Sequence, residues 1–208
     1  ASILFLPSLH PGDSKVRYDW NPLSTYLVSL KQMAQTPLLL VLFAWSFFYL
    51  LAGMAMLILP EYTIVLSITD TRASILMGCM AVGIGLGSVS AGLISGRRIR
   101  PELVIVGGCG LAISFLLLGL VSPTYGNVSV FISMAGFFAG FYLIPLQALM
   151  QDLAPENARG RYLGTANGMN FAFLGLGSIV FWLIRPLFNG VAEGSRDMPE
   201  KIFLCCGG

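Results

Sequence analysis

The sequence predicts an all-α integral membrane protein, and three observations lead to that fold class. Hydrophobic residues make up 56% of the 208 residues, whereas charged residues make up only 11%. Soluble domains carry roughly 25% charged residues, so the deficit is large. Five long apolar stretches also recur along the chain. Each is close to the length of about 20 residues that a helix needs to cross a bilayer.

These five stretches are the expected membrane-spanning helices, and none of them contains a charged residue. They cover residues 37–60, 73–95, 103–121, 128–150 and 162–184. A sixth span is expected to begin at residue 202 and to be truncated by the end of the chain. The bundle is therefore expected to occupy residues 37–208, and we expect the chain to be part of a longer protein.

The first 36 residues are expected to hold the end of a preceding helix, a cytoplasmic linker and a short amphipathic helix on the membrane surface. Asn21 and Pro22 are typical of a helix start, because asparagine caps the first turn and proline fits within it. The apolar residues that follow recur at spacings of three and four, namely Leu23, Leu27, Leu30 and Ala34. His10, the only histidine, precedes this helix and is expected to be a solvated linker residue.

Lysine and arginine are distributed unevenly between the two sides of the predicted bundle. Eight of the twelve lie in the N-terminal segment and in the connections after the second and fourth spans. The other four lie on the opposite side, three of them in or beside the long last connection. Cytoplasmic loops are enriched in basic residues. The cytoplasmic side is therefore predicted to hold the segments around Arg97, Arg98 and Arg100 and around Arg159 and Arg161.

Small residues recur four positions apart within the spans, which lets helix backbones approach closely. The sets are Gly83–Gly87–Ala91, Gly92–Gly96, Gly136–Gly140 and Gly164–Gly168–Ala172. They predict a tightly packed bundle. The stretch "GIGLGS" lacks the full spacing of a nucleotide-binding loop, and no strand precedes it, so a nucleotide site is not expected.

Few polar side chains lie within the spans, and five of them are candidate substrate contacts: Trp45, Tyr49, Gln147, Asn167 and Asn170. Trp45 and Tyr49 share one face of the first span, and the two asparagines share one face of the fifth. Polar groups in lipid must find a partner or face a water-filled cavity. Two interpretations therefore stay open: hydrogen bonds between helices, or the lining of a cavity that contacts substrate.

Several absences limit the function. No ionisable side chain lies at mid-membrane depth, so this segment is expected to supply neither a proton relay nor a voltage sensor. No set of nucleophile and base is present, which predicts that the chain is not an enzyme. The four cysteines lack metal-binding and redox spacings, so no metal, cofactor or disulfide framework is expected. The net charge of +2 does not suggest a nucleic-acid partner.

Two basic connections carry a resemblance to a known family. They read "GSVSAGLISGRRIRPE" and "PENARGRYLG", and with the spans they resemble the C-terminal half of a major facilitator superfamily transporter. The resemblance implies a six-helix half whose last helix is truncated, with the missing N-terminal half as its partner. It also implies that Arg97, Arg98, Arg159 and Arg161 act as cytoplasmic gate loops. These arginines would engage acidic groups or helix C-termini when the inner side is closed.

Further stretches are similar to the lysophospholipid-transporter branch of that superfamily, and they read "WNP", "LPEY" and "YLIPLQALMQDLAPENARGRYLGTANGMNF". Gln147 stands where asparagine is expected in that branch. This likeness implies a flippase of the bacterial inner membrane, with membrane lipid and a small amphipathic substrate as partners and an acyltransferase as a possible partner or fusion. A facilitator for another small amphipathic solute and a membrane anchor for a fused acyltransferase are the alternatives.

Overall fold

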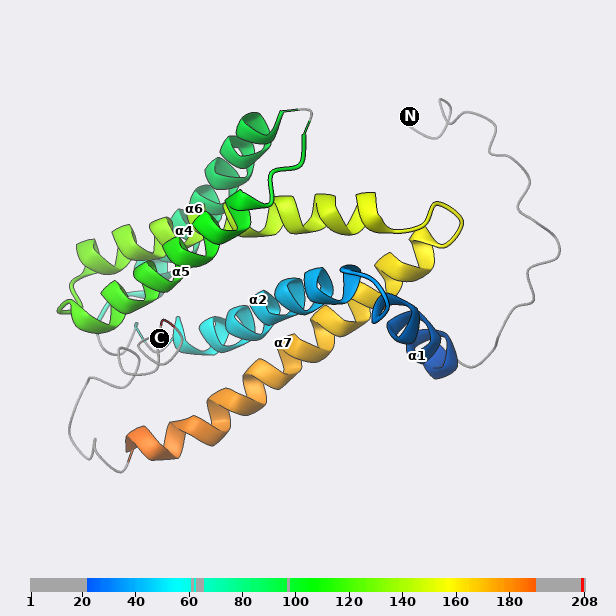
Figure 1. Ribbon diagram of the computed structural model, residues 1–208. Helices are drawn as coiled ribbons and strands as arrows, with labels where there is room; N and C mark the ends of the chain where they lie inside the picture. The colour runs from blue at the N-terminus through cyan, green and yellow to red at the C-terminus, as the bar shows by residue number, and fades with distance from the viewer. Residues whose placement is uncertain (1–21, 61, 63–65, 97, 190–206, 208) are drawn as a thin grey trace, which may run out of the picture.

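The computed structural model describes residues 22–60, 62, 66–96, 98–189 and 207, and no strand is found among them. Six helices follow one another within these residues (Figure 1). They are α1 (Pro22–Met33), α2 (Leu38–Ile58), α4 (Asp70–Ser95), α5 (Glu102–Leu120), α6 (Tyr125–Leu153) and α7 (Arg159–Asn189). The all-helical fold class predicted from the sequence is therefore confirmed for this part of the chain.

Five of these helices, α2 and α4 to α7, are long and apolar enough to cross a membrane. They lie where the five spans were predicted, with differences of a few residues at their ends. The helices α4, α6 and α7 contain 26, 29 and 31 residues, so they continue beyond their apolar stretches. A helix longer than the bilayer thickness accommodates the excess by tilting or by projecting into the interface. The predicted sixth span from residue 202 lies outside the described residues, as do His10 and Asn21.

The helix ends follow from local chemistry. Thr124 caps α6, because its hydroxyl oxygen accepts a hydrogen bond from the backbone N–H of Asn127 at 3.2 Å. Gly96 follows α4 with a φ of +55°, a conformation that glycine adopts without the steric cost of a side chain. Pro155 follows α6 by two residues, where a proline cannot continue the helix.

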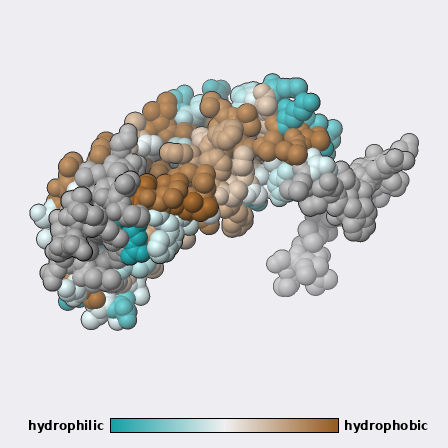
Figure 2. All heavy atoms as spheres, turned by 90° about the horizontal axis from the view of Figure 1, so that it is seen from below, coloured by the Kyte–Doolittle hydropathy of each residue, from teal (hydrophilic) through white to brown (hydrophobic). Residues whose placement is uncertain are grey.

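Helix α6 holds the bundle together, because it contacts α2, α4, α5 and α7. Its most extensive contacts are with α4 and α5, while α2 packs mainly along α7. Figure 1 shows α2 and α7 side by side and α4, α5 and α6 grouped next to them. Figure 2 shows apolar surface over the middle of the molecule and hydrophilic residues toward its ends, as expected for a bundle surrounded by lipid.

The basic end is the end of the bundle where α4 and α6 finish and where α5 and α7 begin. Five exposed basic side chains gather there: Lys31, Arg98, Arg100, Arg159 and Arg161. A cluster of buried apolar residues packs four helices together at this end, and it joins Met33 of α1, Leu42 of α2, Met150 of α6 and Tyr162 of α7.

The predicted close packing of glycines is confirmed where α4 crosses α6. A Cβ added at Gly83 or Gly87 would meet the backbone of α6, and one added at Gly136 or Gly140 would meet the backbone of α4. Each helix thus presents two glycines to the other, and the two backbones come into contact.

The prediction was wrong for three other glycines. A Cβ at Gly92, Gly96 or Gly164 would meet no described atom within 4 Å. Gly168 does have a close neighbour, but it is the side chain of Tyr26 in α1 and not another membrane-spanning helix. Spacing alone does not say which face of a helix is covered: no described atom lies within 4 Å of a Cβ at Gly92 or Gly164, and Gly96 lies beyond the end of α4.

Candidate functional site

The candidate site lies where α2 packs against α7. Two glycines set the separation of these helices, because a Cβ at Gly53 would meet the backbone of Leu174 and a Cβ at Gly177 would meet the backbone of Leu50. About two helical turns away, toward the basic end, the Ser46 hydroxyl donates a hydrogen bond to Oδ1 of Asn170. The two atoms are 2.9 Å apart.

Two hydrogen-bond donors remain unsatisfied beside this contact. Asn170 is 2% exposed and Trp45 is 6% exposed. Neither the amide nitrogen Nδ2 of Asn170 nor the indole Nε1 of Trp45 has a hydrogen-bond partner in the described part of the chain. Leaving a buried polar group without a partner costs roughly 1–3 kcal/mol. Because both groups are donors, the site has unused capacity for an oxygen acceptor.

An aromatic contact connects this region to α6. The Tyr142 hydroxyl donates to the backbone oxygen of Ala44 at 2.9 Å, which joins α6 to α2. The Phe48 ring stacks on the Tyr142 ring, with centroids 5.9 Å apart and an interplanar angle of 27°. Phe48 also meets the edge of Tyr49, at a centroid separation of 6.0 Å. Phe48 and Tyr49 lie on α2 about one turn after Trp45.

An apolar crevice begins at Phe48. Its volume is about 210 Å³, and it lies between α2, α4, α5 and α6. Phe48 lines it together with apolar side chains such as Met56, Ile84, Phe115 and Leu143. Since Phe48 follows Trp45 by three residues, the crevice starts about one helical turn from the Trp45 donor. Asn170 contacts Ser46, which lies about 200° around α2 from Phe48, so only Trp45 adjoins the apolar space along α2.

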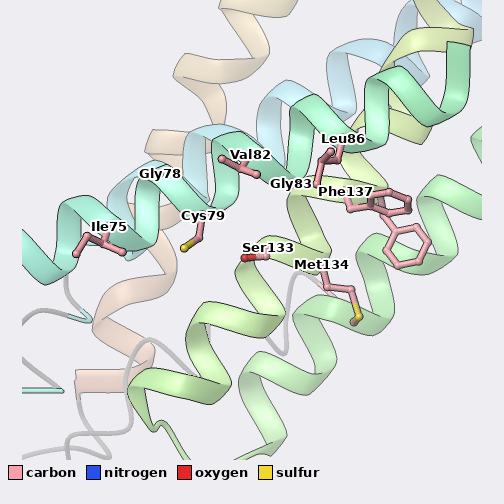
Figure 3. Close-up of a pocket in the computed structure, with 10 residues that line it drawn as sticks. Ile75, Gly78, Cys79, Val82, Gly83, Leu86, Ser133, Met134 and Phe137 are labelled. Atoms are coloured by element: carbon pink, nitrogen blue, oxygen red, sulfur yellow. The ribbon is translucent and has the colours of Figure 1, made fainter.

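A second apolar space is an open groove between α4 and α6, with a volume of about 760 Å³ (Figure 3). Figure 3 shows Ile75, Cys79 and Val82 on the α4 side and Ser133 and Met134 on the α6 side. The Ser133 hydroxyl donates to the Ser129 backbone oxygen of its own helix at 2.7 Å. The groove shares no lining residue with the crevice.

The structure brings together two of the five predicted substrate contacts. Trp45 and Asn170 lie on helices that pack together, and Asn170 bonds to Ser46, the residue after Trp45, which the sequence did not single out. The signal for Ser46 was weak, because serine is common in membrane helices and often bonds to its own backbone. Of the two interpretations left open for the asparagines, the hydrogen bond between helices is thus observed for Asn170.

The other three predicted contacts are placed differently. Tyr49 and Gln147 are half-buried, and Asn167 is exposed on α7. The three-residue spacing of Asn167 and Asn170 rotates the two side chains apart by about 60° around the helix axis. That rotation is enough to bury one against α2 and to leave the other on the surface.

The gate-loop arginines lie at the basic end. Arg98 and Arg159 are exposed, while Arg97 lies outside the described residues. Arg161 donates from Nη2 to Oε1 of Gln32 in α1 at 2.7 Å. The Tyr162 hydroxyl donates to the same oxygen at 3.1 Å. Two donors from the first turn of α7 therefore converge on one residue of α1.

The arrangement defines a class of protein: a multi-pass integral membrane protein whose charged side chains are confined to the ends of its helices. Within the described ranges, no group of histidine, cysteine, aspartate or glutamate could hold a metal ion. The Major Facilitator Superfamily profile matches residues 1–181, and the chain belongs to this family. Members of the family are transporters, which identifies the chain as a secondary membrane transporter. No curated protein and no solved structure matches it.

Proposed function

We propose that the chain is part of a flippase that moves lysophospholipid across the bacterial inner membrane. The observation that supports this proposal most directly is that the unpartnered Trp45 donor and the apolar crevice lie about one turn apart on α2. A lysophospholipid has glycerol, ester and phosphate oxygens that accept hydrogen bonds, and it has one acyl chain. Its two chemical parts correspond to the two parts of the site.

Trp45 Nε1 and Asn170 Nδ2 are the groups proposed to bind an oxygen of the glycerol backbone or headgroup. In the packed conformation of the structure, both donors lie buried without partners in the described chain. An acceptor that reaches them would supply the hydrogen bonds that they lack, and opening of the bundle is needed for that approach. The acyl chain would extend toward Phe48 and the crevice beyond it. Tyr49, Gln147 and Asn167 stay predicted contacts.

Transport would follow alternating access, in which two halves of the protein move around a site near the middle of the membrane. The spans described here would form the C-terminal half, and the N-terminal half would supply the rest of the site. Arg97, Arg98, Arg159 and Arg161 would hold the cytoplasmic side closed and release it on opening. Each exposed ion pair contributes at most about 1 kcal/mol, which suits contacts that must break in every cycle.

A carrier for another small amphipathic solute is the second candidate. The same crevice favours it, because the apolar lining selects for hydrophobic volume and not for a particular headgroup. An acyltransferase anchor is the third, and it requires neither unpartnered donors nor gate loops.

Uptake of labelled lysophosphatidylethanolamine by spheroplasts distinguishes these functions. Cells expressing the full-length parent gene would be compared with cells carrying an empty vector. The flippase predicts saturable uptake that falls in an Arg97→Gln/Arg98→Gln variant of equal abundance. Uptake of a hydrophobic drug without uptake of the lipid would favour the second candidate. An anchor predicts no uptake of either compound.

A further inference from the structure

Helix α1 is held firmly on one side. Ser29 and Met33 are fully buried, and Met33 belongs to the apolar cluster at the basic end. Tyr26 covers Gly168, where an added Cβ would lie 2.7 Å from the phenol oxygen. Gln32 accepts the two hydrogen bonds from the first turn of α7 described above. The inner face of α1 therefore has both apolar and polar contacts with α7.

The opposite face of α1 exposes apolar side chains. Leu27 is 67% exposed and Val28 is 47% exposed. Lys31 lies one turn after Leu27 on the same side and is also exposed. A short helix with exposed leucine and valine beside a lysine has the pattern of an interfacial helix, whose apolar side enters the boundary between headgroups and acyl chains.

The connection to α2 keeps α1 close to the start of a membrane-spanning helix. Only residues 34–37 separate the two helices, and four residues span at most roughly 14 Å. The connection is also folded back, because Thr36 bonds through both its backbone N–H and its hydroxyl to the backbone oxygen of Met33, at 3.0 and 2.9 Å. Since α2 is apolar from its first residue, α1 must lie close to the membrane surface.

The excess of basic side chains at the basic end favours its binding to an anionic membrane surface. The five exposed basic side chains at the basic end exceed the exposed acidic ones described there, which are Glu102, Asp152 and Glu156. Anionic headgroups of the cytoplasmic leaflet attract such basic segments. Leu27 and Val28 would bring Lys31 to the level of the phosphates.

We propose that the outer face of α1 binds the anionic lipid surface and that its inner face transmits this binding to the start of α7. The occupant of the apolar face is thus the bilayer boundary itself. Because Gln32 and Tyr26 join α1 to residues 161–168 of α7, insertion of α1 steadies that part of α7. The inference does not depend on which substrate is transported.

The first test measures how deeply residue 27 of α1 lies in the bilayer. Full-length protein with its native cysteines replaced would carry a nitroxide at Leu27→Cys, in vesicles of phosphatidylcholine or of equal parts phosphatidylcholine and phosphatidylglycerol. Asp152→Cys, exposed at the same end, is the matched control. The expected result places the label at position 27 roughly 5–10 Å below the headgroup surface. There it is reached by oxygen and shielded from an aqueous nickel complex, and more strongly so with phosphatidylglycerol.

Two outcomes would overturn the lipid contact. Nickel access at position 27 equal to that at position 152 would place the outer face in water. Shielding from both oxygen and nickel would place it against protein.

The second test measures whether lipid binding to α1 stabilises the start of α7. In unlabelled full-length protein, amide hydrogen exchange of residues 162–168 is expected to slow when phosphatidylglycerol is included. Gln32→Ala should remove this lipid dependence and leave the depth of the label at position 27 unchanged. Equal exchange in the two lipids for the wild-type protein would refute the transmission, whatever the depth measurement shows. Neither readout requires transport, so failure of the proposed function would not affect them.

Discussion

Replacing Gly87 by alanine should weaken the contact between α4 and α6. The added Cβ would lie 2.7 Å from the carbonyl carbon of Phe137 and 2.9 Å from its Cα. Nonbonded carbon atoms prefer separations of about 3.5–4.0 Å. The obstructing atoms belong to the backbone of a long helix, so no side-chain rotation can relieve the clash. The helices must move apart instead.

The expected cost can be estimated from two opposing effects. Overpacking a well-packed interface costs about 1–3 kcal/mol, and a backbone clash belongs at the upper end of that range. Alanine has a higher helix propensity than glycine, by about 1 kcal/mol, which offsets part of the cost. The net destabilisation of Gly87→Ala should therefore be about 2 kcal/mol.

Gly85 provides the matched control two residues earlier in the same helix. A Cβ at Gly85 would meet no described atom within 4 Å. Gly85→Ala should therefore show only the gain in helix propensity, so its stability should be equal to or higher than that of the wild type. The two substitutions change the same chemical group at nearly the same depth, and they differ in the packing around it.

Thermal unfolding of the purified full-length protein in detergent measures the difference. Unfolding is followed by loss of the monodisperse peak in size-exclusion chromatography after heating. The structure predicts a lower midpoint for Gly87→Ala and an unchanged or higher midpoint for Gly85→Ala. Equal midpoints for the two variants would refute the packing of α4 on α6 described here.

Three further substitutions test the site and the gate. Ser46→Ala leaves the Asn170 amide without its donor and should cost about 1–3 kcal/mol in thermal unfolding. A Ser46→Ala/Asn170→Leu double variant that is no more stable than the single variant would argue against this cause. Tyr142→Phe keeps the ring and loses one hydrogen bond, so it should lower the stability by about 0.5–1.5 kcal/mol. An unchanged midpoint of unfolding would show that the hydrogen bond from Tyr142 to Ala44 does not stabilise the contact between α6 and α2. Arg98→Gln should slow transport without lowering stability, because its side chain is exposed, and an unchanged rate would exclude it from the gate.

The membrane spans could be predicted from sequence because the bilayer imposes a length and excludes charge. Both constraints are local, so they can be detected without knowing how the helices pack. The contact between α4 and α6 could also be anticipated, since glycines four residues apart occur on both helices. Gly83 and Gly87 on one side and Gly136 and Gly140 on the other make that contact.

The contact between α2 and α7 could not be predicted in the same way. It depends on two single glycines, Gly53 and Gly177. Neither has a second glycine four residues away in its own helix, so the sequence gives no sign that they lie at a helix contact. Their role follows from the position at which two distant helices cross. The same crossing decides that Asn170 is buried with Ser46 and that Asn167 is exposed.

Transport of lysophospholipid by the purified full-length protein tests the central proposal most directly. Protein in liposomes would be compared with protein-free liposomes of the same lipid, using labelled lysophosphatidylethanolamine and its removal from the outer leaflet by albumin. A lysophospholipid flippase should give a protected, saturable fraction that forms only with the protein. The wild type should also form this fraction faster than Trp45→Phe, which retains the ring without the Nε1 donor. No protected fraction with a folded, monodisperse protein would contradict the assignment of a lysophospholipid substrate.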